Sequence, residues 1–121
     1  MAFRVLLADD LYFMRMVQKE VLEAKGYEIV GEASTGTEAV EKFQELNPDI
    51  MILDITMPEM NGLEAMRKIF QIDPQARIII CSAIGQQNLI VEAINAGIKD
   101  FIVKPFKPER LLGAIQKALA E

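Results

Sequence analysis

The chain contains no histidine and no tryptophan, and Cys81 is its only cysteine. The absence of histidine excludes Ser-His triads, histidine general bases and zinc sites built on imidazole. A single cysteine excludes an intrachain disulfide, and because Cys81 lies in an apolar run we expect a small buried side chain there. No apolar stretch approaches the roughly 20 residues of a membrane-spanning helix, and the N-terminus has no signal-peptide pattern. We therefore expect a cytoplasmic protein.

The composition is that of an ordinary globular domain. The 121 residues are 51% hydrophobic and 26% charged, which suits one domain with a single core. The formal net charge of −5 argues against non-specific binding to nucleic acid or to an anionic membrane. We expect no direct DNA binding and no membrane association.

The chain is organised around the stretch from Pro48 to Gly62. Residues 50–53 form an unbroken apolar run, as in strands buried on both faces of a parallel sheet. The run stops at Asp54, and because burying an unpaired carboxylate is costly, we expect Asp54 at the strand's carboxyl end. Asn61 then caps the next helix, with Glu64 completing a capping box.

Short apolar segments alternate with amphipathic segments along the whole chain. We expect strands at 3–8, 28–33, 50–53, 77–81 and 100–103, and helices at 11–25, 35–46, 62–72, 87–96 and 108–120. This alternation predicts a parallel sheet covered on both faces. Because a closed barrel needs eight units and about 250 residues, we expect an open, flavodoxin-like α/β/α sheet with strand order 2-1-3-4-5.

Polar residues follow the predicted strands at one edge of this sheet. Asp9 and Asp10 follow the first strand, Asp54 the third, Ser82 the fourth and Lys104 the fifth. In the expected strand order, the first and third strands are neighbours at the topological switch point, where ligands bind beyond the carboxyl ends. Taken alone, each residue is an ordinary loop residue or helix cap, but their shared placement favours a site.

Three converging carboxylates repel one another and need protons or a cation. Because they offer hard oxygen ligands, the expected cation is Mg²⁺, for which Mn²⁺ can substitute. Lys104 supplies a positive charge for a phosphate or for Asp54, and Ser82 supplies a hydroxyl donor. A carboxylate can accept a phosphoryl group covalently. The set therefore suits phosphoryl transfer.

Four motifs carry a resemblance that covers nearly the whole chain. They are Asp-Asp at 9–10, Leu-Asp-Ile-Thr-Met-Pro-Glu-Met-Asn-Gly at 53–62, Cys-Ser-Ala at 81–83 and Lys-Pro-Phe at 104–106. Together they resemble the receiver domains of two-component response regulators. The likeness is strongest to the single-domain chemotaxis receivers of bacteria outside the enteric group.

The resemblance implies a role for each site residue. Asp54 is expected to accept the phosphoryl group, and Mg²⁺ to bind Asp10, Asp54 and the backbone carbonyl of Thr56 directly, and Asp9 through water. Lys104 is expected to contact the phosphoryl group, and Ser82 and Phe101 to act as switch residues. The resemblance, and the need for Lys104 to turn back towards Asp54, also predict a cis Lys104–Pro105 bond.

The resemblance further implies that the chain is no conventional enzyme, although it catalyses its own phosphorylation and dephosphorylation. The expected donor is a phosphohistidine on a chemotaxis-type histidine kinase. The expected effector is a flagellar motor switch protein that binds the face formed by helix 87–96, strand 100–103 and the last helix. An auxiliary phosphatase is a further possible partner, and a monomer is expected.

Several alternatives remain open at this stage. We expect residues 1–121 to form one receiver domain without an output domain, partly because the chain starts at Met1, but a fragment of a larger regulator would look the same. A haloacid-dehalogenase-type phosphatase needs a second aspartate where Thr56 stands. A flavodoxin-like cofactor binder would have Asp9 and Asp10 repelling its phosphate, and a purely scaffolding receiver would usually have lost an acid or the lysine.

Overall fold

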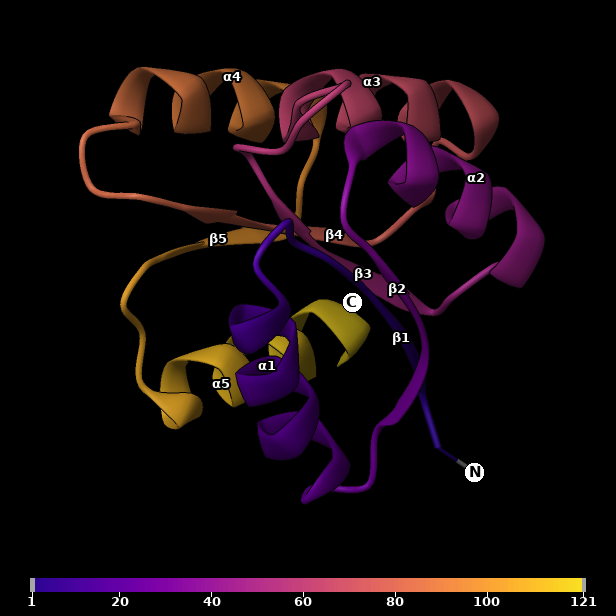
Figure 1. Cartoon of the computed structure of the whole chain (residues 1–121), viewed down its shortest axis with the longest axis vertical. Helices are drawn as coiled ribbons and strands as arrows, with labels where there is room; N and C mark the ends of the chain where they lie inside the picture. Colours follow the sequence, from indigo (N-terminus) through magenta and orange to yellow (C-terminus); the bar gives the residue numbers. More distant parts are fainter. Residues whose placement is uncertain (1, 121) are drawn as a thin grey trace.

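The computed structural model describes residues 2–120, so Met1 lies outside the described residues. Five strands alternate with five helices, as the sequence predicts (Figure 1). In chain order they are β1 (Arg4–Ala8), α1 (Tyr12–Glu23), β2 (Glu28–Ala33), α2 (Gly36–Leu46), β3 (Ile50–Asp54), α3 (Gly62–Ile72), β4 (Ile78–Ser82), α4 (Gln87–Ala96), β5 (Asp100–Val103) and α5 (Pro108–Ala120). None of the helices described is long and apolar enough to cross a membrane.

The strands form one parallel sheet in the order β2-β1-β3-β4-β5. Helices α1 and α5 lie against one face of this sheet, and α2, α3 and α4 lie against the other (Figure 1). The predicted three-layer, doubly wound fold is confirmed. Because β1 and β3 are neighbours, the connections leaving them diverge at the centre of one sheet edge, where ligands bind in such folds.

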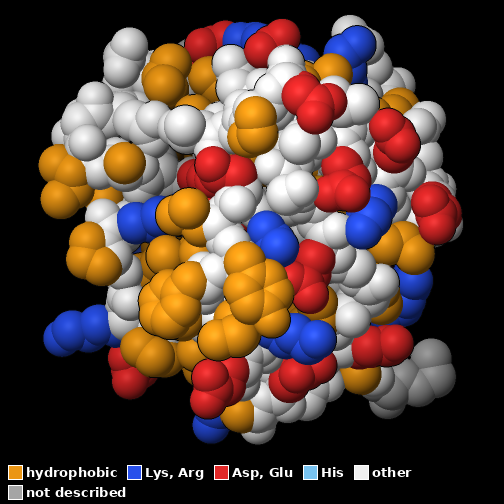
Figure 2. All heavy atoms as spheres, viewed as in Figure 1, with side chains coloured by type: hydrophobic (Ala, Val, Ile, Leu, Met, Phe, Trp, Pro, Cys, Tyr) orange, Lys and Arg blue, Asp and Glu red, His pale blue; other side chains and the backbone are white. Residues whose placement is uncertain are grey.

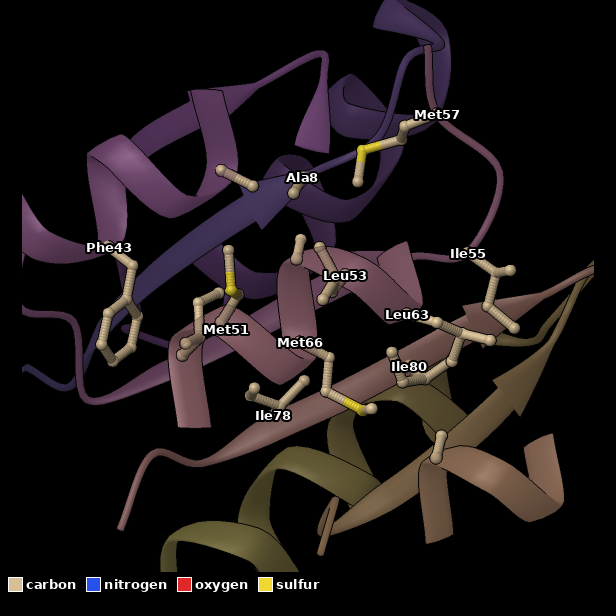
Figure 3. Close-up of a cluster of buried hydrophobic side chains, with 14 of the residues drawn as sticks. Ala8, Phe43, Met51, Leu53, Ile55, Met57, Leu63, Met66, Ile78 and Ile80 are labelled. Atoms are coloured by element: carbon tan, nitrogen blue, oxygen red, sulfur yellow. The ribbon is translucent and has the colours of Figure 1, made fainter. Parts of the chain in front are cut away.

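Each face of the sheet has its own hydrophobic core. Met51 and Leu53 of β3 contribute to the core under α2, α3 and α4 (Figure 3), whereas Ile50 and Ile52 contribute to the core under α1 and α5. Successive side chains of a strand point to opposite faces, so one apolar run supplies both cores. All five residues of β3 are buried, which anchors Asp54 at the carboxyl end of the central strand.

Local capping holds the helices that border the sheet edge. Thr35 accepts a hydrogen bond from the Glu38 N–H, and Asn61 accepts one from the Glu64 N–H, as predicted. In a capping box the Glu38 carboxylate would accept a hydrogen bond from the Thr35 N–H in return, but the structure differs from this prediction. The Glu38 carboxylate accepts from the Ser34 N–H, one residue before the cap.

Several predicted bounds need correction. Strand β1 begins at Arg4 rather than at residue 3, and α2 begins at Gly36 because Thr35 is its N-cap. Helix α1 begins at Tyr12 and ends at Glu23, because tight turns carry the chain through residues 24–26 to Gly26, whose φ is +88°. The strand prediction 77–81 moves by one residue to β4 at Ile78–Ser82. The prediction 50–53 extends to include Asp54, because this residue still pairs with Cys81 in the sheet.

Candidate functional site

Three carboxylates meet where the central strands of the sheet end, at their carboxyl ends. Each of Asp9, Asp10 and Asp54 offers an oxygen within 4.8 Å of the others. The pairing of Ala8 with Leu53 places the ends of β1 and β3 side by side, which brings the three acids together. Asp9 and Asp54 are buried and Asp10 is exposed, so the cluster opens to solvent on the Asp10 side. This set of hard oxygen ligands fits a divalent cation.

Lys104 reaches the same cluster from the end of β5. Its Nζ lies 2.7 Å from Asp9 Oδ2 and 3.3 Å from Asp54 Oδ1. The Lys104 backbone N–H donates to the Ser82 carbonyl, which keeps the chain beside β4 after β5 ends. The Lys104–Pro105 peptide bond is cis, as predicted. One lysine thus partly compensates two buried carboxylates.

The electrostatics of the cluster raise the pKa of Asp54 to about 6. Burial is the largest cause, Lys104 opposes it, and the charges of Asp9 and Asp10 raise the pKa further. Burial lowers the pKa of Lys104, but the hydrogen bond to Asp9 and the charge of Asp54 outweigh it, so this pKa is raised. Around neutral pH Asp54 is therefore mainly ionised and is a potential oxygen nucleophile.

The two predicted switch residues border one cavity. Ser82 ends β4 and is buried, while Phe101 lies on the neighbouring strand β5, opposite Ile80. Both line a mostly apolar cavity of about 290 Å³, whose other wall is α4 with Ile90 and Val91. Ser82 therefore connects the carboxylate edge with a space beside the Phe101 ring. Phe101 itself is not part of the carboxylate cluster.

Sequence patterns did not indicate two polar contacts near the site. Gln86 bonds both the Ala83 N–H and the Thr56 hydroxyl, which links the loops after β4 and β3. At the other end of β5, Arg110 bonds Asp100 and the Phe101 carbonyl. No motif marks these residues, because their partners are distant in sequence or are backbone atoms.

An exposed hydrophobic patch lies next to the carboxylates. Figure 2 shows hydrophobic side chains gathered over the region where Figure 1 places α1 and α5. The exposed members at the start of α1, directly after Asp10, are Leu11, Tyr12, Phe13 and Met16. The Arg15 guanidinium lies 5.6 Å from the centre of the Tyr12 ring. A molecule that approaches Asp54 from solvent therefore meets an apolar surface as well as negative charge.

Comparisons with known proteins agree with this geometry. A family model described as the response regulator receiver domain matches residues 5–116. The chain is 58% identical to the chemotaxis protein CheY of Thermotoga maritima, over 97% of this chain and 98% of that protein. It is 56% identical to Bacillus subtilis CheY, over 98% and 99%. Among solved structures, the CheX–CheY–BeF3–Mg²⁺ complex of Borrelia burgdorferi matches with a TM-score of 0.93 and 35% identity, covering 98% of this chain and 90% of that one.

Proposed function

The chain belongs to the family of response regulator receiver domains, and from this premise we propose that it accepts a phosphoryl group on Asp54. Its close relationship to CheY is consistent with phosphorelay signalling, and the family consists of signalling domains rather than classical enzymes. The observation that carries the proposal is the convergence of Asp54 with two further carboxylates and Lys104. Asp9 lies closer to the lysine, at 2.7 Å against 3.3 Å for Asp54, but Asp54 is the acid that ends the central strand of the sheet.

The proposed step is a displacement at phosphorus. An ionised Asp54 oxygen attacks the phosphorus of a phosphohistidine, the phosphorus–nitrogen bond breaks, and the imidazole leaves with the electron pair and takes up a proton. The product is an acyl phosphate on Asp54. Lys104 turns from Asp9 towards the added phosphoryl oxygens, and the Ser82 hydroxyl donates to one of them. Hydrolysis of this acyl phosphate, which the same site promotes, returns the resting protein.

Receiver domains bind Mg²⁺ at an acidic aspartate cluster, and the three carboxylates at this sheet edge fit that ion. We assign Asp10, Asp54 and the Thr56 backbone carbonyl as direct ligands and Asp9 as a ligand through water, with Mn²⁺ as a possible substitute. When bound, the cation neutralises the carboxylates and stabilises negative charge on the transferring group. The CheY of B. burgdorferi has been solved with BeF3 and Mg²⁺, which supports this assignment.

Acetyl phosphate provides the direct test, because it needs no kinase. With Mg²⁺ present, the intact mass should rise by one phosphoryl group in the wild type and in the control Glu41→Gln, whose exposed side chain lies outside the cluster. Asp54→Asn should show no gain, because an amide is not a nucleophile for this step. Full phosphorylation of Asp54→Asn would exclude Asp54 as the acceptor.

The partners follow from the same relationship. We assign a chemotaxis-type histidine kinase as the donor, a flagellar motor switch protein as the effector, and an auxiliary phosphatase of the kind that the CheX–CheY complex suggests. The relatives are matched over 98–99% of their length, which supports one receiver domain over residues 1–121, and we further propose that this domain is monomeric and acts in the cytoplasm.

The output surface that we assign is formed by α4, β5 and α5. Phosphorylation draws Ser82 towards Asp54, which frees space beside Phe101 in the shared cavity, and the ring turns inwards. Binding of a motor-switch peptide to phosphorylated wild type and to Phe101→Ala tests this route. If phosphorylation strengthens binding equally in both proteins, the aromatic ring does not transmit the signal.

A further inference from the structure

The side chain of Gln86 bridges the two loops that border Asp54. Its Oε1 accepts a hydrogen bond from the Ala83 N–H at 2.7 Å, and its Nε2 donates to Thr56 Oγ1 at 3.1 Å. A backbone N–H can only donate, so the amide oxygen must face Ala83 and the amide nitrogen must face Thr56. One side chain therefore forms a hydrogen bond to each of the two loops.

The bridge continues the pairing of β3 and β4 beyond the ends of these strands. Asp54 pairs with Cys81, and the Ile55 N–H donates to the Cys81 carbonyl. Beyond this pairing lie the Thr56 hydroxyl, after β3, and the Ala83 N–H, after β4. Gln86 joins these two groups. The loop that leads from Ser82 to α4 is thus tied to the loop that follows Asp54.

The Gln86 side chain does not cap the helix that it precedes, although the Gln86 backbone carbonyl accepts hydrogen bonds from the Leu89 and Ile90 N–H groups. It occupies the N-cap position of α4, yet its side chain makes no capping hydrogen bond. Ser, Thr, Asp and Asn are the usual residues at this position because their short side chains reach the helix N–H groups. The Gln86 side chain instead turns back across the sheet edge, so its contacts belong to the site rather than to α4.

We propose that Gln86 is a positioning residue, a latch that holds the loop between β4 and α4 in the resting arrangement until Asp54 is phosphorylated. This inference rests on the proposed phosphorylation of Asp54. A phosphoryl group adds anionic oxygens to Asp54, whose partner in the sheet, Cys81, lies two residues before Ala83. Because a hydrogen bond to an anion is about twice as strong as one to a neutral amide, these oxygens displace the Gln86 carbonyl. The loop is then free to carry Ser82 towards Asp54.

The latch itself is tested in the resting protein, without Mg²⁺ or a phosphodonor. In ¹⁵N-labelled Gln86→Ala, the Ala83 amide proton should move upfield and exchange faster with solvent, because its acceptor is gone. The control is Asn88→Ala, an exposed position in α4 outside the cavity, where the Ala83 signal should stay in place. An unchanged Ala83 signal in Gln86→Ala would overturn the latch.

The effect on phosphorylation is tested with acetyl phosphate and Mg²⁺, followed by intact mass. If only molecules with the released loop react with acetyl phosphate, the apparent affinity for acetyl phosphate is reduced by the fraction of molecules that are latched. Loss of the two bonds in Gln86→Ala should lower the half-saturating acetyl phosphate concentration roughly three- to tenfold, with the maximal rate unchanged. Asn88→Ala should match the wild type. A merely structural role for Gln86 would not lower the half-saturating concentration while leaving the maximal rate unchanged.

A second variant separates the latch from any effect on folding. Thr56→Val removes the hydroxyl but keeps the backbone carbonyl, and in a double-mutant cycle with Gln86→Ala its effect should be far from additive, since both act on one bridge. Additive effects, or a wild-type concentration dependence in Gln86→Ala, would overturn the proposal. If the wild type itself gains no mass, both the phosphorylation of Asp54 and the proposed role of the latch are rejected. The Ala83 amide signal would then still report whether the Gln86 hydrogen bonds exist.

Discussion

The buried carboxylate of Asp54 destabilises the resting fold around neutral pH. Its pKa is about 6 in the folded state, against an ordinary value of 3.8, mainly because burial disfavours the ionised form. Between these two pH values the folded state binds more protons than the unfolded state, so stability falls as pH rises through this range. The site thus keeps a nucleophile that weakens the fold, as strained functional groups often do.

Replacing this one group should reverse the effect. In EDTA, Asp54→Asn should gain stability over the wild type as pH rises from about 4 to about 6, and the difference should then stay constant. The shift corresponds to about 3 kcal/mol at most. Urea unfolding followed by circular dichroism at several pH values measures the difference.

Asp100 provides a control of opposite sign. Burial raises the pKa of Asp100, but hydrogen bonds from Arg110 and from the Phe101 N–H outweigh it, so this pKa is lowered. Asp100→Asn should therefore be less stable than the wild type at neutral pH, and the gap should close as pH falls below about 4. Parallel pH profiles for the two variants would contradict the assigned electrostatics.

Gln18 is a second residue that opposes stability. It is buried in α1, where its Nε2 lies 3.9 Å from Cys81 Sγ. Its Oε1 is the one buried side-chain nitrogen or oxygen atom of the described residues without a hydrogen-bond partner in the protein. An unpaired buried acceptor costs about 1–3 kcal/mol, since its hydration is lost without replacement. The neighbouring thiol is a weak donor and acceptor and compensates little.

Gln18→Met should stabilise the protein, because methionine has a similar shape and no oxygen to desolvate. We expect a gain of about 1 kcal/mol in the free energy of unfolding, measured by urea unfolding. Gln71→Met on the exposed face of α3 should change the stability little. A loss of stability in Gln18→Met would show that the amide oxygen has a partner, such as a buried water.

At the scale of elements, hydrophobic periodicity and capping residues sufficed to predict most of the fold. Helix α4 ends before Gly97, whose φ of +110° favours glycine, and α5 begins at Pro108, as the sequence predicts. The carboxylate cluster and Lys104 were also predictable, because parallel strands end at one sheet edge. Such reasoning works where a residue's role depends on its own strand or helix.

Side chains that join separate elements could not be predicted in this way. Gln86 reaches Thr56 across 30 residues, and Gln18 faces Cys81 across 63. Neither contact changes the periodicity or the capping pattern of its segment. Such pairings depend on tertiary geometry, which local patterns do not encode.

Strand β5 shows how a side-chain pair can protect the edge of a sheet. The Asp100 carboxylate accepts from the Phe101 N–H at 2.7 Å, and the Arg110 guanidinium donates to the Phe101 carbonyl at 2.6 Å. The two side chains also form a two-point ion pair, with both distances 3.1 Å. Because β5 is an edge strand, this pair satisfies backbone groups that would otherwise be open to another strand.

Arg110→Ala should therefore cost more than the loss of an ordinary surface ion pair. Arg67, which pairs with Glu92, is the matched control, since the two arginine side chains are 46% and 48% exposed. We expect a loss of about 1 kcal/mol for Arg110→Ala and under about 0.5 kcal/mol for Arg67→Ala. Equal losses in urea unfolding would show that the bond to the Phe101 carbonyl adds nothing.

At the scale of the whole molecule, an uneven distribution of charge is the main feature of the resting state. The chain carries a formal net charge of −5, and three of its carboxylates lie within 4.8 Å of one another. Lys104 is the cation that contacts two of them. A divalent cation that binds this cluster only in the folded state must stabilise the entire fold, because the site does not exist in the unfolded chain.

Mg²⁺ should therefore raise the melting temperature, followed by circular dichroism because the chain has no tryptophan. At ten times the dissociation constant, the linkage gives about 1.4 kcal/mol of added stability. NaCl at matched ionic strength should not reproduce the effect, since screening lacks the site's geometry. Asp10→Asn should lose most of the gain, whereas Glu41→Gln should keep it.

The same experiment distinguishes specific binding from general relief of charge. If the cation acts only on the net charge, Asp10→Asn and Glu41→Gln, which each remove one negative charge, must respond alike to Mg²⁺. If it binds the cluster, only Asp10→Asn changes the response, because Asp10 is the exposed carboxylate at the open side of the site. An unchanged melting temperature of the wild type across millimolar Mg²⁺ would remove the cation from the proposed mechanism, and Lys104 alone would then have to balance the charge of the transferring phosphoryl group.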